Sequence, residues 1–248
     1  MGSEMCIRDS LKAENHFLDV NMSDTDELQS KLFDEYVSRI KQDDTSVPYL
    51  ENGYIYSSKY QKGEDYRRYY RKKNKEGSKE ELFLDLQKLA KEQKYFSLGG
   101  WSISTNNKIL AYSSDLVSRR EYTIHFKDLI TGEIFEDKIE NTTGGITWAN
   151  DNKTVFYVKK DSQTLRSHKI FKHVLGTDSS NDELIYFEED DTFYTGVYRS
   201  KSGKFIIIYH QSTLVSDYQI LNANNPDGSF KKPIRLALET DSGNIVSN

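Results

Sequence analysis

The chain has few of the features that mark disulfide-rich, membrane-spanning or nucleic-acid-binding proteins. Its single cysteine, Cys6, excludes an internal disulfide and a zinc site built from cysteines. Its longest unbroken apolar run is the five-residue stretch Phe205–Tyr209, whereas a helix needs about 20 apolar residues to cross a bilayer. It has no basic block, and 34 Lys and Arg against 39 Asp and Glu give a net charge of −5. We therefore expect neither a membrane nor a nucleic acid as partner, because phosphate binding needs clustered cations.

The two ends of the chain need separate treatment. The string MCIRDS at Met5–Ser10 corresponds to the translated end of an adaptor used in sequencing libraries. We interpret residues 1–10 as a non-native tail, with an ordinary N-terminal tail as the alternative. The native start is then not visible, so cytoplasm and periplasm both stay open as the location. Because Asp241–Asn248 stops without structural punctuation, we expect the chain to be a fragment.

Residues 11–46 have the pattern of a helical lead-in. Ser23 is placed to cap the second helical segment, and acidic residues follow it where the helix dipole favours negative charge. Apolar residues then recur every three or four positions along one face: Leu28, Leu32, Phe33, Tyr36, Val37 and Ile40. Pro48 ends the region, since proline lacks the donor that continues a helix.

Beyond Pro48 the pattern becomes strand-like and repeats. Four segments begin with a turn residue and continue into a strand rich in Tyr, Ile and Val; they start at Gly53, Asn107, Asn152 and Gly203. An aromatic strand precedes each of them, and further strands follow. Four strands per unit with a period near 50 residues indicate the blades of a β-propeller, although a β-sandwich is an alternative. We predict an all-β fold, a partial β-propeller of about four four-stranded blades over residues 47–248.

Several strings in this order and spacing resemble the prolyl oligopeptidase family of serine peptidases, and within it the oligopeptidase B branch. They are Leu11–Asn15 (LKAEN), Arg39–Tyr49 (RIKQDDTSVPY), Asn52–Arg71, Ser118–Glu133, Trp148–Asp161, His173–Thr177 (HVLGT) and Asp182–Arg199. The family's aromatic WLRD-like element, which comes just before the first string, is missing here, and the match is poor from Phe230 onward.

The resemblance implies a ring of seven blades that covers an α/β-hydrolase domain and admits only short peptides. It also implies a Ser-Asp-His triad in that hydrolase domain and, for oligopeptidase B, cleavage after Lys or Arg. The hydrolase domain follows the propeller in the family and is not in this chain. No catalytic residue can therefore be transferred, and we expect the chain alone to be inactive, with the hydrolase domain of the same protein and short peptides as its partners.

The residues themselves offer no catalytic site. The nearest approach to a G-x-S-x-G elbow is Gly100–Ser104, which lacks the closing glycine and falls in a strand. Among the five histidines, His168 and His173 are five apart in an extended segment and point to opposite faces, which argues against a shared metal. We expect no cofactor and no metal ion.

Three charged stretches have a functional interpretation beside a structural one. Glu188–Asp191 could bind a divalent cation or a basic peptide, but a solvated loop between blades is favoured. The basic run Arg67–Lys73, interleaved with tyrosines, resembles a nucleic-acid patch, yet strand alternation favours an exposed strand pair. Arg119, Arg120 and Glu121 are candidates for an ion pair with another domain, because blades and domains meet in this loop region in the family that the chain resembles.

We therefore predict the substrate-gating propeller of a serine oligopeptidase. A stand-alone propeller that binds a protein or peptide is the alternative. A propeller glycosidase is a weaker alternative, because its chemistry needs a pair of carboxylates and the sequence shows no such pair.

Overall fold

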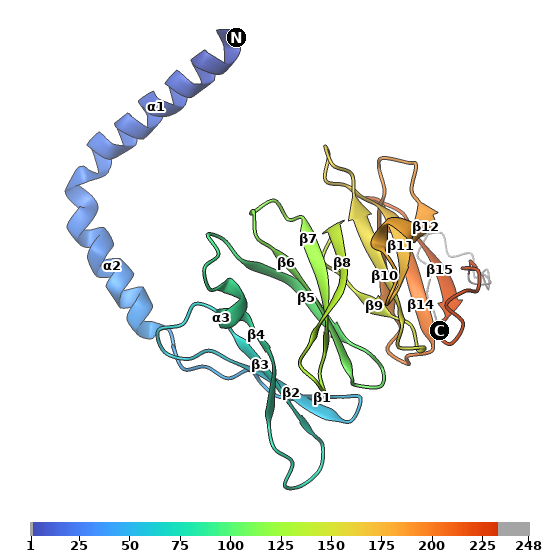
Figure 1. Cartoon of the computed structure of the whole chain (residues 1–248). Helices are drawn as coiled ribbons and strands as arrows, with labels where there is room; N and C mark the ends of the chain where they lie inside the picture. The colour runs from blue at the N-terminus through green and yellow to red at the C-terminus, as the bar shows by residue number, and fades with distance from the viewer. Residues whose placement is uncertain (1, 233–248) are drawn as a thin grey trace, which may run out of the picture.

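In the computed structural model, which describes residues 2–232, a bent helical arm leads into a curved array of antiparallel sheets (Figure 1). The arm consists of α1 (Gly2–Met22), the short 3-10 turn η1 (Ser23–Thr25) and α2 (Asp26–Arg39). Ser23 does not cap α2, contrary to prediction: it lies in η1, and its hydroxyl donates to the carbonyl of Val20. No helix of the described residues is long and apolar enough to cross a bilayer.

The predicted apolar face of the arm is exposed. α2 buries none of its residues, and Phe33 and Tyr36 leave about two thirds of their surface open, at 67% and 64%. The arm projects away from the sheets in Figure 1. Its periodicity therefore produces a helix without a packing partner in the described part of the chain.

The sheets form four successive units. Their strands are, in the first unit, β1 (Tyr49–Glu51), β2 (Tyr54–Lys59), β3 (Arg68–Lys73) and β4 (Glu81–Asp85); in the second, β5 (Ser97–Ile103), β6 (Ile109–Asp115), β7 (Tyr122–Asp128) and β8 (Ile134–Thr142); in the third, β9 (Thr147–Trp148), β10 (Thr154–Lys160), β11 (Ser167–Val174) and β12 (Glu183–Phe187); and in the fourth, β13 (Tyr194–Arg199), β14 (Phe205–Gln211) and β15 (Ser216–Asn222). A short helix, α3 (Leu86–Ala90), follows β4, and a 3-10 turn, η2 (Ser179–Asn181), precedes β12.

Each unit is an antiparallel meander, in which consecutive strands pair. The four turn-and-strand segments predicted from the repeat are β2, β6, β10 and β14, so the partial propeller is confirmed. The fourth unit has three strands and an isolated bridge from Ile220 to Lys231 in the described range. The expectation for the segment after Phe230 falls mostly on residues 233–248, outside the described residues, as does the C-terminal stretch Asp241–Asn248. The limits 11–46 and 47–248 stay predictions.

The core lies between adjacent blades. Phe83 and Trp101 meet edge to face at 5.0 Å between the first two blades, and Phe126 meets Trp148 at 5.9 Å between the second and third. Phe156 and Ile206, both fully buried, join the third blade to the fourth. Burying one such side chain contributes about 2 kcal/mol, so each blade depends on its neighbours for its apolar core.

The turn residues that open the repeats have left-handed backbones. Asn52, Asn107 and Asn152 have φ values of 44°, 62° and 60°, and Gly203 has 70°. Asparagine and glycine accept this conformation at low cost. The chemistry of the turn therefore explains why these residue types recur about every 50 positions.

Candidate functional site

The first strands of the four blades line a groove of about 450 Å³. β1 and β13 border it from the outermost blades, while β5 and β9 form its floor between them. The residues that matter for its chemistry are Tyr49, Glu51, Trp101, Tyr198 and Arg199. The groove is built only when all four repeats curve around one axis.

One wall of the groove is aromatic. Tyr49 stacks on Tyr56 at 5.4 Å, and Tyr56 lies 5.8 Å from Trp101. Partial burial and the neighbouring Glu51 carboxylate raise the pKa of Tyr49 to about 12. This phenol therefore stays protonated at neutral pH and can donate a hydrogen bond.

The groove also carries two opposite charges. Arg199 donates from Nη2 to the side-chain oxygen of Asn150 and to the carbonyl of Gly203, the latter at 3.0 Å. Its Nε is enclosed and has no partner among the described residues. Burial lowers the pKa of Arg199, and the Glu51 carboxylate partly offsets this. The guanidinium remains charged, because the ordinary pKa of arginine lies far above neutral pH.

Asparagine turns connect the blades at one end of the groove. Asn52 donates to the carbonyl of Thr105 at 2.7 Å, and Asn107 donates to the carbonyl of Asn52 at 3.2 Å. The side-chain oxygen of Asn152 accepts from the hydroxyl of Thr105 at 2.9 Å and from the backbone of Asn106 at 2.7 Å. These contacts join three blades through their turns.

The predicted ion-pair region, Arg119, Arg120 and Glu121, lies in the loop between β6 and β7. Buried Asp115 shapes this loop by accepting from the backbone of Val117 at 2.8 Å and of Arg120 at 2.7 Å. Both arginine side chains are exposed, and neither has a carboxylate partner in residues 2–232.

This loop lies at the end of the strands opposite the asparagine turns, because β6 runs away from its turn. The helical arm leaves the sheets at the same end, where Thr45 bridges to Lys59 at the end of β2. The region and the arm therefore share one face of the array, and the ion-pair role stays a prediction.

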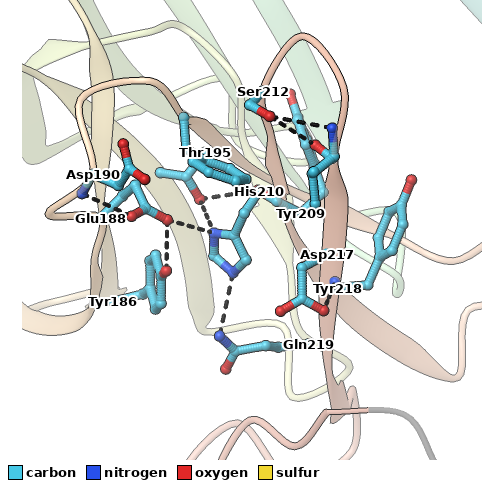
Figure 2. A network of polar contacts seen from close by, with 12 residues as sticks. Tyr186, Glu188, Asp190, Thr195, Tyr209, His210, Ser212, Asp217, Tyr218 and Gln219 are labelled. Carbon is cyan, nitrogen blue, oxygen red and sulfur yellow. Dashed lines mark hydrogen bonds and ion pairs between the residues drawn. The ribbon is translucent and has the colours of Figure 1, made fainter. Parts of the chain in front are cut away.

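A polar network joins the third and fourth blades around His210 (Figure 2). Glu188 accepts from the hydroxyl of Tyr186 at 2.7 Å and lies 3.6 Å from Nδ1 of His210. Thr195 lies 3.1 Å from the same nitrogen, and Gln219 lies 3.2 Å from Nε2. Burial lowers the pKa of His210, more than Glu188 raises it. The prediction of a solvated loop at Glu188–Asp191 is thus wrong for Glu188, which turns inward to the next blade.

The basic run Arg67–Lys73 is also less exposed than predicted. Arg71 keeps only 4% of its surface open, since it pairs with Glu81 and donates to the carbonyl of Asn107 at 2.9 Å. The contact crosses to the second blade, so this arginine serves the packing of blades and is not an exposed strand residue.

The histidines and the serine string have structural surroundings. Ser102 lies within β5, as expected of a strand. His173 is fully buried, with Nδ1 at 2.7 Å from Asp182, which also accepts from the hydroxyl of Tyr157 at 2.7 Å. In residues 2–232 no group of three His, Cys, Asp or Glu side chains is placed to hold a metal ion.

Residues 7–245 match the family model described as the N-terminal β-propeller domain of prolyl oligopeptidase. The chain belongs to the prolyl oligopeptidase family. It is 41% identical over 231 residues to dipeptidyl aminopeptidase BI of Pseudoxanthomonas mexicana, covering 87% of this chain and 32% of that one. It is 31% identical over 240 residues to protease 2 of Moraxella lacunata, covering 94% and 34%.

Solved structures of the prolyl oligopeptidase family agree with this assignment. Oligopeptidase B from Leishmania major superposes with a TM-score of 0.83 at 27% identity, over 93% of this chain and 33% of its own length. The corresponding enzyme from Trypanosoma brucei, solved with covalently bound antipain, gives 0.77 at 27% identity, over 90% and 32%. The chain thus spans about a third of the length of these relatives, and the predicted resemblance is confirmed.

The groove charges of this prolyl oligopeptidase propeller were missed from the sequence. Glu51 and Arg199 lie at corresponding places in the first and fourth repeats, at the ends of their first strands. Aligning the four repeats with one another would have placed both residues on the inner strands. It would not have shown that they share one groove.

Proposed function

We propose that this chain is the substrate-gating propeller of a serine oligopeptidase whose hydrolase domain lies elsewhere in the same protein. The proposal rests on the length relation, in which nearly the whole chain aligns with about a third of peptidase relatives. The substrate would be a short peptide cut after Lys or Arg. The hydrolase domain would supply the nucleophile and its base, while the ring excludes folded proteins.

The experiment compares two proteins, the product of the full gene and residues 1–248 alone. We expect the full product to hydrolyse an arginyl-amide substrate and the isolated chain to leave it intact. Cleavage by the isolated chain would contradict the proposal, and so would a gene that encodes further blades and then stops without a G-x-S-x-G elbow. In the second case a stand-alone peptide-binding propeller becomes the function.

A second candidate activity is removal of dipeptides from free N-termini, because the relative that is 41% identical carries the name dipeptidyl aminopeptidase. Matched substrates with free and acetylated N-termini separate the two activities. An endopeptidase cleaves both, whereas a dipeptidyl aminopeptidase requires the free amine.

We further propose that Arg119, Arg120 and Glu121 face the hydrolase domain. The position of these residues supports this, because they lie on the face of the array where the helical arm leaves the sheets. In the full-length product, replacing both arginines by glutamine should lower activity and make it less sensitive to salt, since ionic contacts are screened by salt. A location in the cytoplasm or periplasm is part of the proposal, and cell fractionation checks it.

A further inference from the structure

The groove between β1 and β13 contains a cation and an anion that no described side chain neutralises. Arg199 and Glu51 both line it, and neither takes part in an ion pair within residues 2–232. They influence each other across the groove, since Glu51 acts to raise the pKa of Arg199. They are not in contact. Opposite charges at two places in one groove suit a ligand with a charge at each end.

The hydrogen bonds of Arg199 leave room for a carboxylate. Its Nη2 is used by the neutral oxygens of Asn150 and Gly203, which hold the guanidinium in place without neutralising it. Its Nη1 makes no hydrogen bond within residues 2–232 and, unlike Nε, is not among the enclosed unpaired atoms. A guanidinium with a fixed orientation and a free donor is well suited to a carboxylate.

The space between the two charges is lined for a peptide. Tyr49, Trp101 and Tyr198 offer aromatic faces, which favour the side chains and backbone of a peptide. Asn52 and Asn107 also line the groove, with their side-chain amides already engaged in the hydrogen bonds that join the first two blades. A phosphate-rich ligand would be repelled by Glu51.

We propose that this groove binds the C-terminal end of a short peptide, with its carboxylate on Nη1 of Arg199 and its amino group or a basic side chain towards Glu51. This deepens the proposed function and rests on it, because it identifies which end of the peptide the propeller holds. The carboxylate contact would select short peptides over chains whose C-terminus is buried in a folded protein.

Binding is measured with residues 1–248 and tetra-alanine as the probe. Tryptophan fluorescence reports binding because Trp101 and Trp148 both line the groove; Trp148 is only 2% exposed, so Trp101 is the more accessible reporter. Four forms of the peptide are titrated: free at both ends, amidated at the C-terminus, acetylated at the N-terminus, and blocked at both ends. We expect amidation to weaken binding at least tenfold and acetylation to weaken it severalfold.

Two variants assign these effects to residues. With Arg199→Gln, the free acid should bind as weakly as the amide, so that amidation no longer matters. With Glu51→Gln, acetylation should no longer matter while amidation still does. Lys201→Gln is the matched control, because it removes a positive charge from the exposed turn of the same hairpin and should leave all four affinities unchanged.

Folding is checked separately, since Arg199 also joins its blade to Asn150. Circular dichroism verifies each variant, and Arg199→Lys keeps the charge with a different arrangement of donors. An effect of amidation below twofold in the wild-type chain would overturn the proposal. The proposal would also be overturned if Arg199→Gln weakened the binding of the free acid and of the amide by the same factor. It would be overturned as well if the wild-type chain bound none of the four peptides.

The binding experiment and the cleavage experiment can fail independently, so failure of the groove proposal is distinguishable from failure of the proposed function. If the peptide series behaves as expected and the full-length product cleaves nothing, the groove site stands and the peptidase assignment fails. If the full-length product cleaves an arginyl-amide substrate and the peptide ends have no effect on binding, the peptidase assignment stands and the groove proposal is wrong.

Discussion

Replacing Asn152 tests whether the turn asparagines hold neighbouring blades together. Its side-chain oxygen accepts two hydrogen bonds from the preceding blade, and its amide donates to the carbonyl of Asn150 at 3.0 Å. At a half-buried site each bond is worth about 0.5–1 kcal/mol net, so the three together contribute about 2 kcal/mol. The left-handed backbone, at φ 60°, costs alanine about 1 kcal/mol more than asparagine.

Asn152→Ala should therefore lower the free energy of unfolding by about 3 kcal/mol. Asn152→Gly loses the same hydrogen bonds but accepts the backbone, and should lose about 2 kcal/mol. Urea unfolding of residues 1–248, followed by tryptophan fluorescence and circular dichroism, measures both values.

Asn141 provides the matched control. It has nearly the same backbone, at φ 59°, but it is exposed, and its side chain makes no hydrogen bond in the described part of the chain. Asn141→Ala should cost only about 1 kcal/mol, through the backbone alone. If Asn152→Ala and Asn141→Ala differ by less than about 0.5 kcal/mol, the turns do not join the blades and the reasoning fails.

Three further predictions concern contacts within and between the blades. Burial lowers the pKa of His210 below its ordinary 6.5, so the unfolded chain binds the proton more readily and the stability of the folded chain falls as the pH drops through that range. The melting temperature should therefore decrease from pH 7.5 to pH 5.5. An equally steep decrease in a His210→Gln variant would contradict this. Gly99→Ala should cost about 1–3 kcal/mol, because the new Cβ would lie 2.5 Å from a tyrosine ring, whereas Gly145→Ala meets nothing closer than 3.9 Å; equal unfolding midpoints for the two variants would refute it. Asp182→Asn should cost about 3 kcal/mol in urea unfolding, since its carboxylate contacts both buried His173 and a tyrosine hydroxyl at 2.7 Å; a loss below 1 kcal/mol would show that the pair contributes little.

Local chemistry explains which expectations were right. The left-handed turns at Asn107, Asn152 and Gly203 are visible in the sequence because few residue types accept that backbone. The strands after them are visible because apolar residues alternate or run together. Both signals depend on residues a few positions apart.

The wrong expectations concerned side chains whose surroundings come from another blade. Arg71 was expected on an exposed strand and is buried, because the second blade offers the carbonyl of Asn107. Glu188 was expected in solvent and turns towards His210. The prediction that Ser23 caps α2 was wrong for a more local reason, because a 3-10 turn occupies the junction where the cap was expected.

The sequence alone determined the order of the elements, the four repeats, the turn residues and the family, because these depend on short stretches and on their spacing. The tertiary structure alone decided the groove. Glu51 and Arg199 are separated by three repeats, and only the curvature of packed blades brings a carboxylate and a guanidinium to face the same space. That curvature arises from side chains filling the gaps between sheets, and no local pattern in the chain encodes it.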